Sequence, residues 1–354
     1  MNISRIIPTI ALLCTTVWAQ PQDLVYTLPT DNTSLYTTGG DEYFMYVDRQ
    51  FEGEKSRPWQ AGTYGMVRNP FRPTAGGSIM YSRFHEGIDV KPIYRSSNGE
   101  PQDTVRPIAP GVVVHTCTMP GHSNYGRYVV IAHTVPEGTI YSLYAHLASV
   151  NCTTGQQLTT KDTIGRLGYS GVGLNKTRAH LHLEIGLMIH SRFEDFYAGE
   201  NKHGNFNGMN LAGFDPAVVL KACQRGTPFS ISRYFASLKE HYRVAVPCIT
   251  AIDIMRRHPF LYKGSKTERT RPQSLEIAFT AEGLPIGIYP ATRQVTQPFI
   301  VSCRPMPTVQ QNCTVNRVKN SSAKAALTVS GLRYVSQYIW TASPANSSVA
   351  RNAH

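Results

Sequence analysis

Short runs of β-branched and aromatic residues alternate with glycine and proline from about residue 62 to residue 186. Strands separated by such breakers are typical of an antiparallel β architecture. We therefore predict a mainly β fold, with an antiparallel sheet as its principal domain. The clearest predicted strands cover residues 111–114, 127–132, 139–144 and 181–185.

The pattern changes beyond residue 189. Asp215 and Pro216 form a good N-cap and first-turn pair, so a short helix is expected to begin there. A second helix is predicted over residues 230–243, because its aromatic and leucine residues recur at roughly helical spacing. Strand-like runs return between residues 274 and 341, which indicates a small β-rich terminal module.

These changes divide the chain into six segments. The first has one early positive charge, a short apolar stretch and a small residue before Gln20, as a secretory signal peptide does. It is shorter than the ~20 apolar residues that span a bilayer, and no later segment is apolar enough. We predict a signal peptide at 1–19, a lead segment at 20–60, the β domain at 61–190, a loop and helical extension at 191–260, the β-rich module at 261–341 and a tail at 342–354.

Composition narrows the class of protein. Hydrophobic residues make up 41% of the 354 positions and charged residues only 16%, which excludes the highly charged disordered class. The net charge of +12 is scattered, and no nucleic-acid-binding motif accompanies it. Such a diffuse positive charge suits an anionic polymer, and simple solubility explains it equally well. The predicted mature protein is exported, to the periplasm or the medium, and monomeric.

Cysteine usage fits export. Of the seven cysteines, Cys14 lies in the predicted signal peptide, which leaves an even set of six. In an oxidising compartment, disulfides are expected in preference to a thiolate metal site. The predicted pairs are local in sequence: Cys117–Cys152, Cys223–Cys248 and Cys303–Cys313.

Two short segments contain residues suited to metal chemistry. His85 and Asp89 are four positions apart, and Gly87 favours a turn that enters a strand between them. His180, His182 and Glu184 alternate with leucines, so on a strand the three polar side chains share one face. One imidazole could then bind a metal while the other reaches its water. A pair of surface histidines on an exposed sheet face is the alternative.

His146 follows a strand-like run at residues 140–145, where a single histidine is more often structural. Taken together, however, the three segments supply two histidines and one carboxylate for zinc and leave a fourth position open for water. Two further histidines remain for proton transfer or oxyanion stabilisation. This set is what metal-assisted amide hydrolysis needs.

The order of these motifs resembles the lysostaphin-type (LytM-like) zinc metallopeptidases. The resemblance covers about a third of the chain, in Arg68–Phe71, His85–Val90, Arg106–Val113, Asn124–Ile131, Tyr144–Leu147, Gly168–Gly171 and Ala179–Ile185. It implies a groove-bearing antiparallel β fold built on a duplicated hybrid motif. It also implies one Zn²⁺ on His85, Asp89 and His182, and catalysis by His146 and His180.

The chain departs from the family in three places. Thr177-Arg178-Ala179 stands where the family usually has proline before His-x-His, the loop at 92–105 is long, and the tail beyond residue 189 has no counterpart in the minimal family domain. These differences leave the predicted zinc site intact and bear on substrate preference. Glu184 could orient a histidine, or be an ordinary solvent-facing glutamate.

The resemblance implies a zinc endopeptidase that cuts cross-links or stem peptides of bacterial peptidoglycan. A non-catalytic wall-binding or amidase-activating protein of the same fold is the alternative, and a secreted protease acting on Gly-rich proteins is a third reading. Peptidoglycan is the expected partner, with no nucleic acid and no integral membrane segment. Because every candidate catalytic residue precedes residue 261, we expect the C-terminal module to be separable from the chemistry.

Overall fold

The computed structural model describes most of the chain after residue 19. The described residues are 20–38, 40–46, 50–55, 58–197, 203–248, 252–265, 272–305, 310–321 and 324–341. The predicted signal peptide at 1–19 and the predicted tail at 342–354 lie outside the described residues. None of the described helices is long and apolar enough to cross a membrane.

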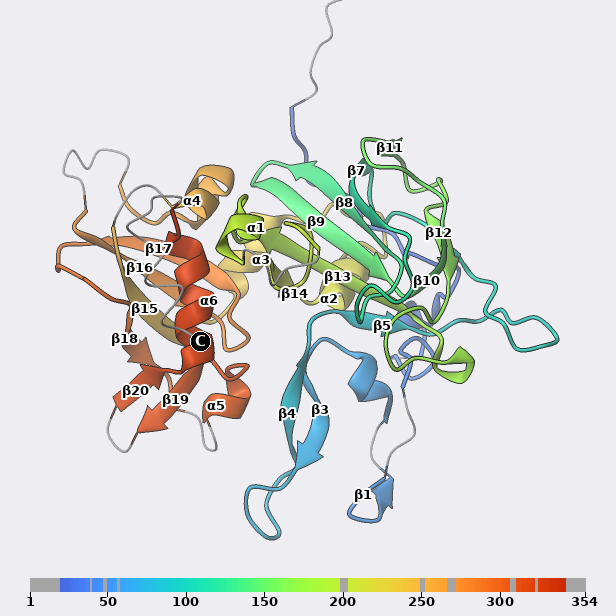
Figure 1. Cartoon of the computed structure of the whole chain (residues 1–354), viewed down its shortest axis with the longest axis horizontal. Helices are drawn as coiled ribbons and strands as arrows, with labels where there is room; N and C mark the ends of the chain where they lie inside the picture. The colour runs from blue at the N-terminus through green and yellow to red at the C-terminus, as the bar shows by residue number, and fades with distance from the viewer. Residues whose placement is uncertain are drawn as a thin grey trace, which may run out of the picture.

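A seven-stranded antiparallel sheet forms the main domain, so the predicted fold class is confirmed (Figure 1). Its strands follow the order β11-β7-β8-β9-β13-β14, and β5 also pairs with β13. The four strands predicted from sequence are β7, β8, β9 and β13. The strands of the sheet are β5 (Ile88–Val90), β7 (Gly111–Cys117), β8 (Tyr128–Val135), β9 (Gly138–Ala145), β11 (Gln157–Leu158), β13 (Leu181–Met188) and β14 (Leu211–Phe214).

Alternating side chains give this sheet two buried faces. On β8, Val129 and Ile131 belong to the large core cluster, whereas Tyr128 and Val130 belong to a smaller cluster on the opposite face. All eight residues of β13 are buried. A strand covered on both faces and paired on both edges is held more rigidly than an edge strand, which suits it to carry a site.

Smaller elements surround the sheet. The lead segment pairs with β5 through a bridge between Phe44 and Val90, and it contains the 3-10 helices η1 (Ser34–Tyr36) and η2 (Pro58–Gly62). A hairpin then projects from the domain (Figure 1). The remaining strands of this part are β1 (Gln50–Phe51), β2 (Glu54–Lys55), the hairpin strands β3 (Gly65–Phe71) and β4 (Met80–His85), and the small sheet of β6 (Thr104–Val105), β10 (Leu147–Val150) and β12 (Gly165–Leu167).

The predicted helical extension is helical only in part. Helix α2 (Pro216–Ala222) begins as predicted, because the Asp215 carboxylate accepts a hydrogen bond of 2.8 Å from the backbone N–H of Ala217. Helix α3 (Ile231–Ser237) is shorter than the predicted 230–243, and the chain enters strand β15 (Tyr242–Pro247) instead. The extension also contains α1 (Phe193–Phe196), and η3 (Lys176–Arg178) lies before it, in the main domain.

The C-terminal module therefore begins near residue 242 and not at 261. Its four-stranded sheet has the order β17-β16-β15-β18, so β15 lies between two strands that follow it in sequence. The module also contains an eleven-residue helix, α6, where only strands were predicted. Its elements are α4 (Asp253–Arg257), η4 (Pro259–Leu261), β16 (Ser274–Phe279), β17 (Pro285–Ala291), β18 (Phe299–Cys303), α5 (Gln310–Cys313), β19 (Val318–Ser321), β20 (Lys324–Leu327) and α6 (Val329–Ile339).

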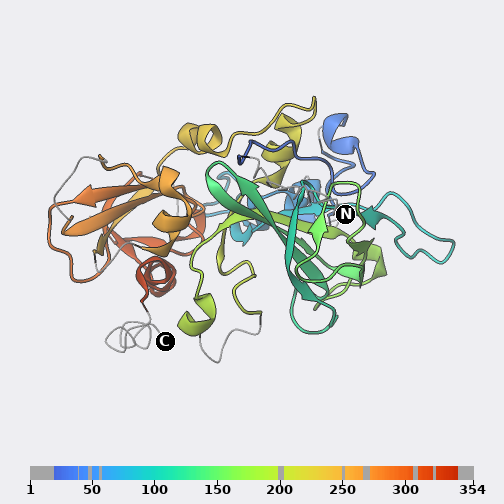
Figure 2. The same ribbon diagram turned by 90° about the horizontal axis from the view of Figure 1, so that it is seen from above.

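Polar contacts join the module to the end of β13. The guanidinium of Arg257 donates to the carbonyl oxygens of Met188 at 2.6 Å and Ile189 at 3.0 Å. His190 is hydrogen-bonded to the carbonyl of Trp340, just after α6, at 3.1 Å. One continuous cluster of buried apolar residues includes side chains from both parts. In both views the orange and red module lies directly beside the green sheet (Figures 1 and 2).

The predicted disulfides do not form. Among the described residues the structure contains no disulfide. Cys117 lies in the small core cluster and Cys152 in the large one, so the sheet separates them and their predicted pairing is wrong. The other two predicted pairs, Cys223–Cys248 and Cys303–Cys313, are likewise absent.

A chain that ends at residue 260 should lose stability, contrary to the expected separability. The cut removes β16 and β18, the two partners of β15, and uncovers apolar residues such as Val244 that are fully buried. Thermal unfolding should show a lowered midpoint for this chain. A control chain ending at residue 341 retains every described element and should unfold like the parent. Equal midpoints for all three proteins would contradict the described packing.

Candidate metal centre

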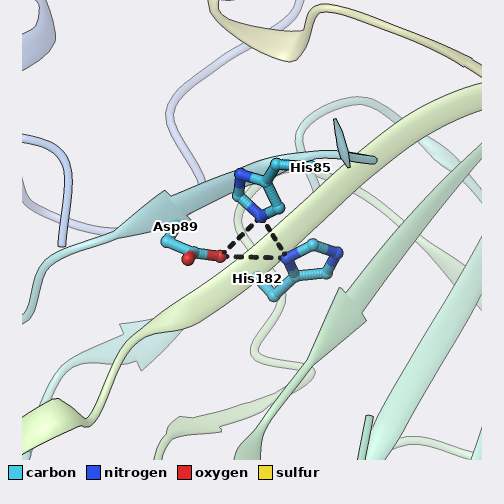
Figure 3. Close-up of side chains that lie close together, drawn as sticks. All are labelled: His85, Asp89 and His182. Carbon is cyan, nitrogen blue, oxygen red and sulfur yellow. Dashed lines mark hydrogen bonds and ion pairs between the residues drawn. The ribbon is translucent and has the colours of Figure 1, made fainter. Parts of the chain in front are cut away.

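Three side chains from three different strands meet at one point of the main domain (Figure 3). His85 ends β4, Asp89 lies in β5 and His182 lies in β13, and all three are buried. The Nδ1 atom of His182 lies 2.9 Å from Oδ1 of Asp89 and 3.1 Å from Nε2 of His85. The remaining side of the triangle, from His85 Nε2 to Asp89 Oδ1, is 3.0 Å.

Backbone pairing explains why these side chains meet. Asp89 and His182 are direct register partners across the antiparallel β5–β13 pair, and partners of this kind have neighbouring Cβ atoms. His85 arrives on the turn that joins β4 to β5. That turn passes so close to β13 that a Cβ on Gly87 would lie 2.2 Å from the carbonyl oxygen of Leu183. Only glycine fits there, as the sequence pattern suggested.

In both histidines, the ring nitrogen that faces away from the centre is hydrogen-bonded. His85 donates Nδ1–H to the carbonyl oxygen of Thr63 at 2.8 Å, which leaves Nε2 to face the centre. His182 donates Nε2–H to Glu184 Oε1 at 3.0 Å, and the Tyr125 hydroxyl donates to the same oxygen at 2.6 Å. Glu184 is only 1% exposed, so it is not a solvent-facing strand residue. Contacts of this type fix the orientation of metal-binding imidazoles.

Asp89 has a partner outside the triangle. The Arg68 guanidinium contacts Asp89 Oδ2, and its Nε donates to the carbonyl of Ala61 at 2.9 Å. The backbone N–H of Met45, in the lead segment, donates to the carbonyl of Asp89 at 2.7 Å. The sequence pattern predicted no role for Arg68, Met45 or Tyr125. The only indication for Arg68 and Tyr125 was their place within the family motifs Arg68–Phe71 and Asn124–Ile131.

His146 and His180 flank the triangle with their ring centroids 4.7 Å apart. His146 Nδ1–H donates to the carbonyl of Ser170 at 2.9 Å, and His180 Nδ1–H donates to the carbonyl of Arg178 at 2.7 Å. His180 Nε2 lies 3.4 Å from Asp89 Oδ1. His146 adopts a left-handed backbone with φ of 63°, which is unusual for a non-glycine residue. The strained turn directs its ring towards the other histidines.

Charge is unevenly distributed over these imidazoles. Burial lowers the pKa of His146 well below its usual range and lowers that of His180. Burial also disfavours a charge on His182, but its hydrogen bonds to the carboxylates of Asp89 and Glu184 raise the pKa to about 10. Two buried carboxylates therefore require positive charge at the centre. A cation bound there would take the place of the proton on His182.

The five predicted residues line one groove of about 640 Å³. Its lining comes from the lead segment, the β3–β4 hairpin and the loops near residues 123, 173 and 208. His203 also lines the groove and is hydrogen-bonded to the Tyr128 hydroxyl at 3.1 Å, so it is more than a plain loop residue. The rest of the lining includes Tyr46, Arg83, Glu86, Val172, Arg178 and Met209.

A buried histidine outside the groove behaves as expected of a structural residue. His133 hydrogen-bonds through one nitrogen to the carbonyl of Pro110 at 2.8 Å and through the other to the Ser142 hydroxyl at 2.7 Å. Both ring nitrogens are therefore satisfied within the core, and neither is available to a ligand.

Comparisons with solved structures give matches of low overall similarity. The chain is similar to LytU, with 18% identity over 44% of this chain and 78% of that chain and a TM-score of 0.26. It is similar to the catalytic domain of the antimicrobial peptidase lysostaphin from Staphylococcus simulans, with 22% identity over 45% and 89% of the two chains and a TM-score of 0.28. It is also similar to a zinc containing peptidase from Vibrio cholerae, with 22% identity over 41% of this chain and 36% of that chain and a TM-score of 0.25. The chain thus spans about a third of that protein.

A comparison with curated proteins gave no match. The comparison with protein-family models is more specific. The model of Peptidase family M23 matches residues 83–192, a segment that begins two residues before His85 and includes every predicted site residue. The family resemblance drawn from the motifs is thus confirmed for this part of the chain. Residues 83–192, about a third of the chain, are similar to Peptidase family M23.

Proposed function

We propose that this protein is an exported zinc metalloendopeptidase that hydrolyses peptide cross-links or stem peptides of bacterial peptidoglycan. The observation that carries the proposal is the meeting of His85, Asp89 and His182 beside two further oriented histidines in one groove. The match to Peptidase family M23 supports the class of reaction. Peptidoglycan as the substrate follows from the family resemblance.

The donor set fits zinc. Two imidazoles and one carboxylate are ligands that Zn²⁺ prefers, and three protein ligands are typical of catalytic sites. Zinc binds such atoms at about 2.0–2.2 Å, so its tetrahedral ligands lie roughly 3.3–3.6 Å apart. The three observed separations of 2.9–3.1 Å are a few tenths of an ångström shorter, so small side-chain shifts would admit the ion. The carbonyl of Thr63 and the carboxylate of Glu184 hold both rings in the tautomers that this requires.

His146 and His180 are prepared to move protons. When bound, zinc lowers the pKa of a water molecule and polarises an amide carbonyl. Both histidines use Nδ1–H in a bond to a backbone carbonyl, so in the neutral form each has its lone pair on Nε2. Their lowered pKa keeps them neutral near pH 7. One imidazole can accept a proton from the attacking water, and the imidazolium can then stabilise the oxyanion or protonate the leaving amine.

A non-catalytic wall-binding or amidase-activating role is the second candidate. A protein that binds without reacting has no need of four histidines whose tautomers are individually set. All five predicted residues are present and line the groove, which favours hydrolysis. The test is to digest purified peptidoglycan with the mature protein and to identify the new termini by mass spectrometry. New amino and carboxyl termini within the peptides support the proposal, whereas binding without new termini supports the second candidate.

Metal should be required for hydrolysis. Chelation should abolish activity and added zinc should restore it, since the proposed reaction depends on a metal to lower the pKa of water and polarise the amide carbonyl. Asp89→Ala should lose the metal, because it removes the carboxylate that faces both imidazoles. Metal analysis and turnover would be measured together, with the exposed Asp195→Ala as the control that retains both. Full activity after exhaustive chelation would reject the assignment.

Replacing His146 or His180 with alanine should lower turnover by a factor of about 10² or more, as loss of an acid–base group does. Zinc content should stay near that of the parent, because neither residue belongs to the triangle of donor atoms. Thermal unfolding of each variant would show that the fold is intact. A variant that retains full turnover, or that fails only because zinc is gone, would remove that histidine from its proposed role.

Glu184 should act as a positioning residue for His182. Glu184→Gln keeps the shape of the side chain and removes the charge that favours a donating Nε2–H on His182. Loss of such a partner typically weakens metal binding by about 10- to 100-fold. Titration against a competing chelator would measure the zinc affinity of parent and variant. Equal affinities would show that the His182–Glu184 contact has no influence on the metal.

A further inference from the structure

Arginines outnumber carboxylates among the residues that line the groove. Its lining contains three arginines, Arg68, Arg83 and Arg178, and the carboxylates of Asp89 and Glu86. Arg68 is paired with Asp89. Among the residues that the structure describes, neither Arg83 nor Arg178 forms an ion pair. Arg83 lies on β4 and Arg178 on η3.

Arg178 has an unfilled hydrogen-bonding position. Its Nη1 makes one long contact of 3.3 Å to the carbonyl of Gly173, while its Nε is buried and has no hydrogen-bond partner. A buried unsatisfied donor is costly, and that of a charged group more so. Arginine presents its donors as a planar fork that matches a carboxylate with two parallel hydrogen bonds. An anionic group that enters the groove would be bound by the outer Nη atoms of Arg178, which make only the one long contact, and would neutralise its charge.

The position of Arg178 places that group next to the reaction. Its backbone carbonyl accepts the hydrogen bond from His180 Nδ1, so this residue is in direct contact with a proposed catalytic histidine. Because this contact uses the backbone, it does not occupy the side chain of Arg178, a residue that lines the groove. The same residue stands where sequence analysis found a departure from the family pattern, at Thr177-Arg178-Ala179.

We propose that Arg178 is a specificity-determining residue that binds a free carboxylate adjacent to the amide bond that is cut. This rests on the proposed function and narrows its substrate class. A cross-link from D-alanine to a diaminodicarboxylic acid has such a carboxylate beside the amide, because the carbon that bears the linking amine also bears a carboxyl group, provided that this group is not amidated. A bridge made only of glycine has none along its length. The protein therefore prefers the first kind of cross-link.

The test compares two synthetic peptides that differ in one group. Both contain D-alanine joined to the side-chain amine of a diaminodicarboxylic acid, with the carboxylate on the same carbon as that amine either free or converted to a carboxamide. The parent protein should hydrolyse the free acid with a kcat/KM about tenfold higher or more, the scale of one charge-assisted hydrogen bond. Arg178→Gln should reduce this ratio towards one, mainly through KM. The exposed Arg225→Gln, away from the groove, should leave it unchanged.

Binding separates this inference from the proposed function. Calorimetry on the zinc-loaded His146→Ala protein, with and without Arg178→Gln, measures affinity for both peptides while hydrolysis is slow. Preferential binding of the acid without any hydrolysis by the parent would keep the inference and reject the proposed function. Hydrolysis of the acid and the amide at equal rates would support the proposed function and overturn the inference. An equal loss for both peptides in Arg178→Gln would show a merely structural role and overturn the inference.

Discussion

The antiparallel pairing of β5 with β13 is the constraint on which the rest of the site depends. It puts Asp89 directly opposite His182, in a register that a shift of one residue would destroy. On the other edge, β13 pairs with β9, so the strand that contains His182 cannot slide. Gly87 permits the close turn that brings His85 to the same point. Two buried carboxylates then make positive charge at the centre favourable.

Parts of the chain that are remote in sequence secure this pairing. The lead segment covers the free edge of β5, where Met45 bonds to the backbone of Asp89 and Phe44 bridges Val90. The C-terminal module secures the far end of β13 through Arg257 and His190. Neither segment supplies a proposed ligand. Both restrict the two strands that do, which is how a site gains the rigidity that pre-organised catalysis requires.

The local pattern of the sequence predicted the strands of the main domain, the glycine turn and the start of α2. The grouping of the histidines came from the family resemblance, because their contacts join residues almost 100 positions apart. The module boundary was missed because Tyr242 continued an apparent helical spacing, although the alternation from Tyr242 to Pro247 also fits a strand. Helix α6 was missed, although Thr328 is a good N-cap and Leu332, Val335 and Ile339 recur at helical spacing. The contacts of Arg68 and Tyr125 depend on tertiary packing that no local pattern contains.

The central claim is that one zinc ion binds where the three strands meet. Crystals of the mature protein grown with one equivalent of zinc, and recorded at wavelengths on both sides of the zinc absorption edge, test it most directly. We predict a single strong anomalous peak bounded by His85 Nε2, Asp89 Oδ1 and His182 Nδ1, with His146 and His180 beside it and not bound to the ion. No peak at that position, or a peak elsewhere in the groove, would show that the three residues do not form the zinc site.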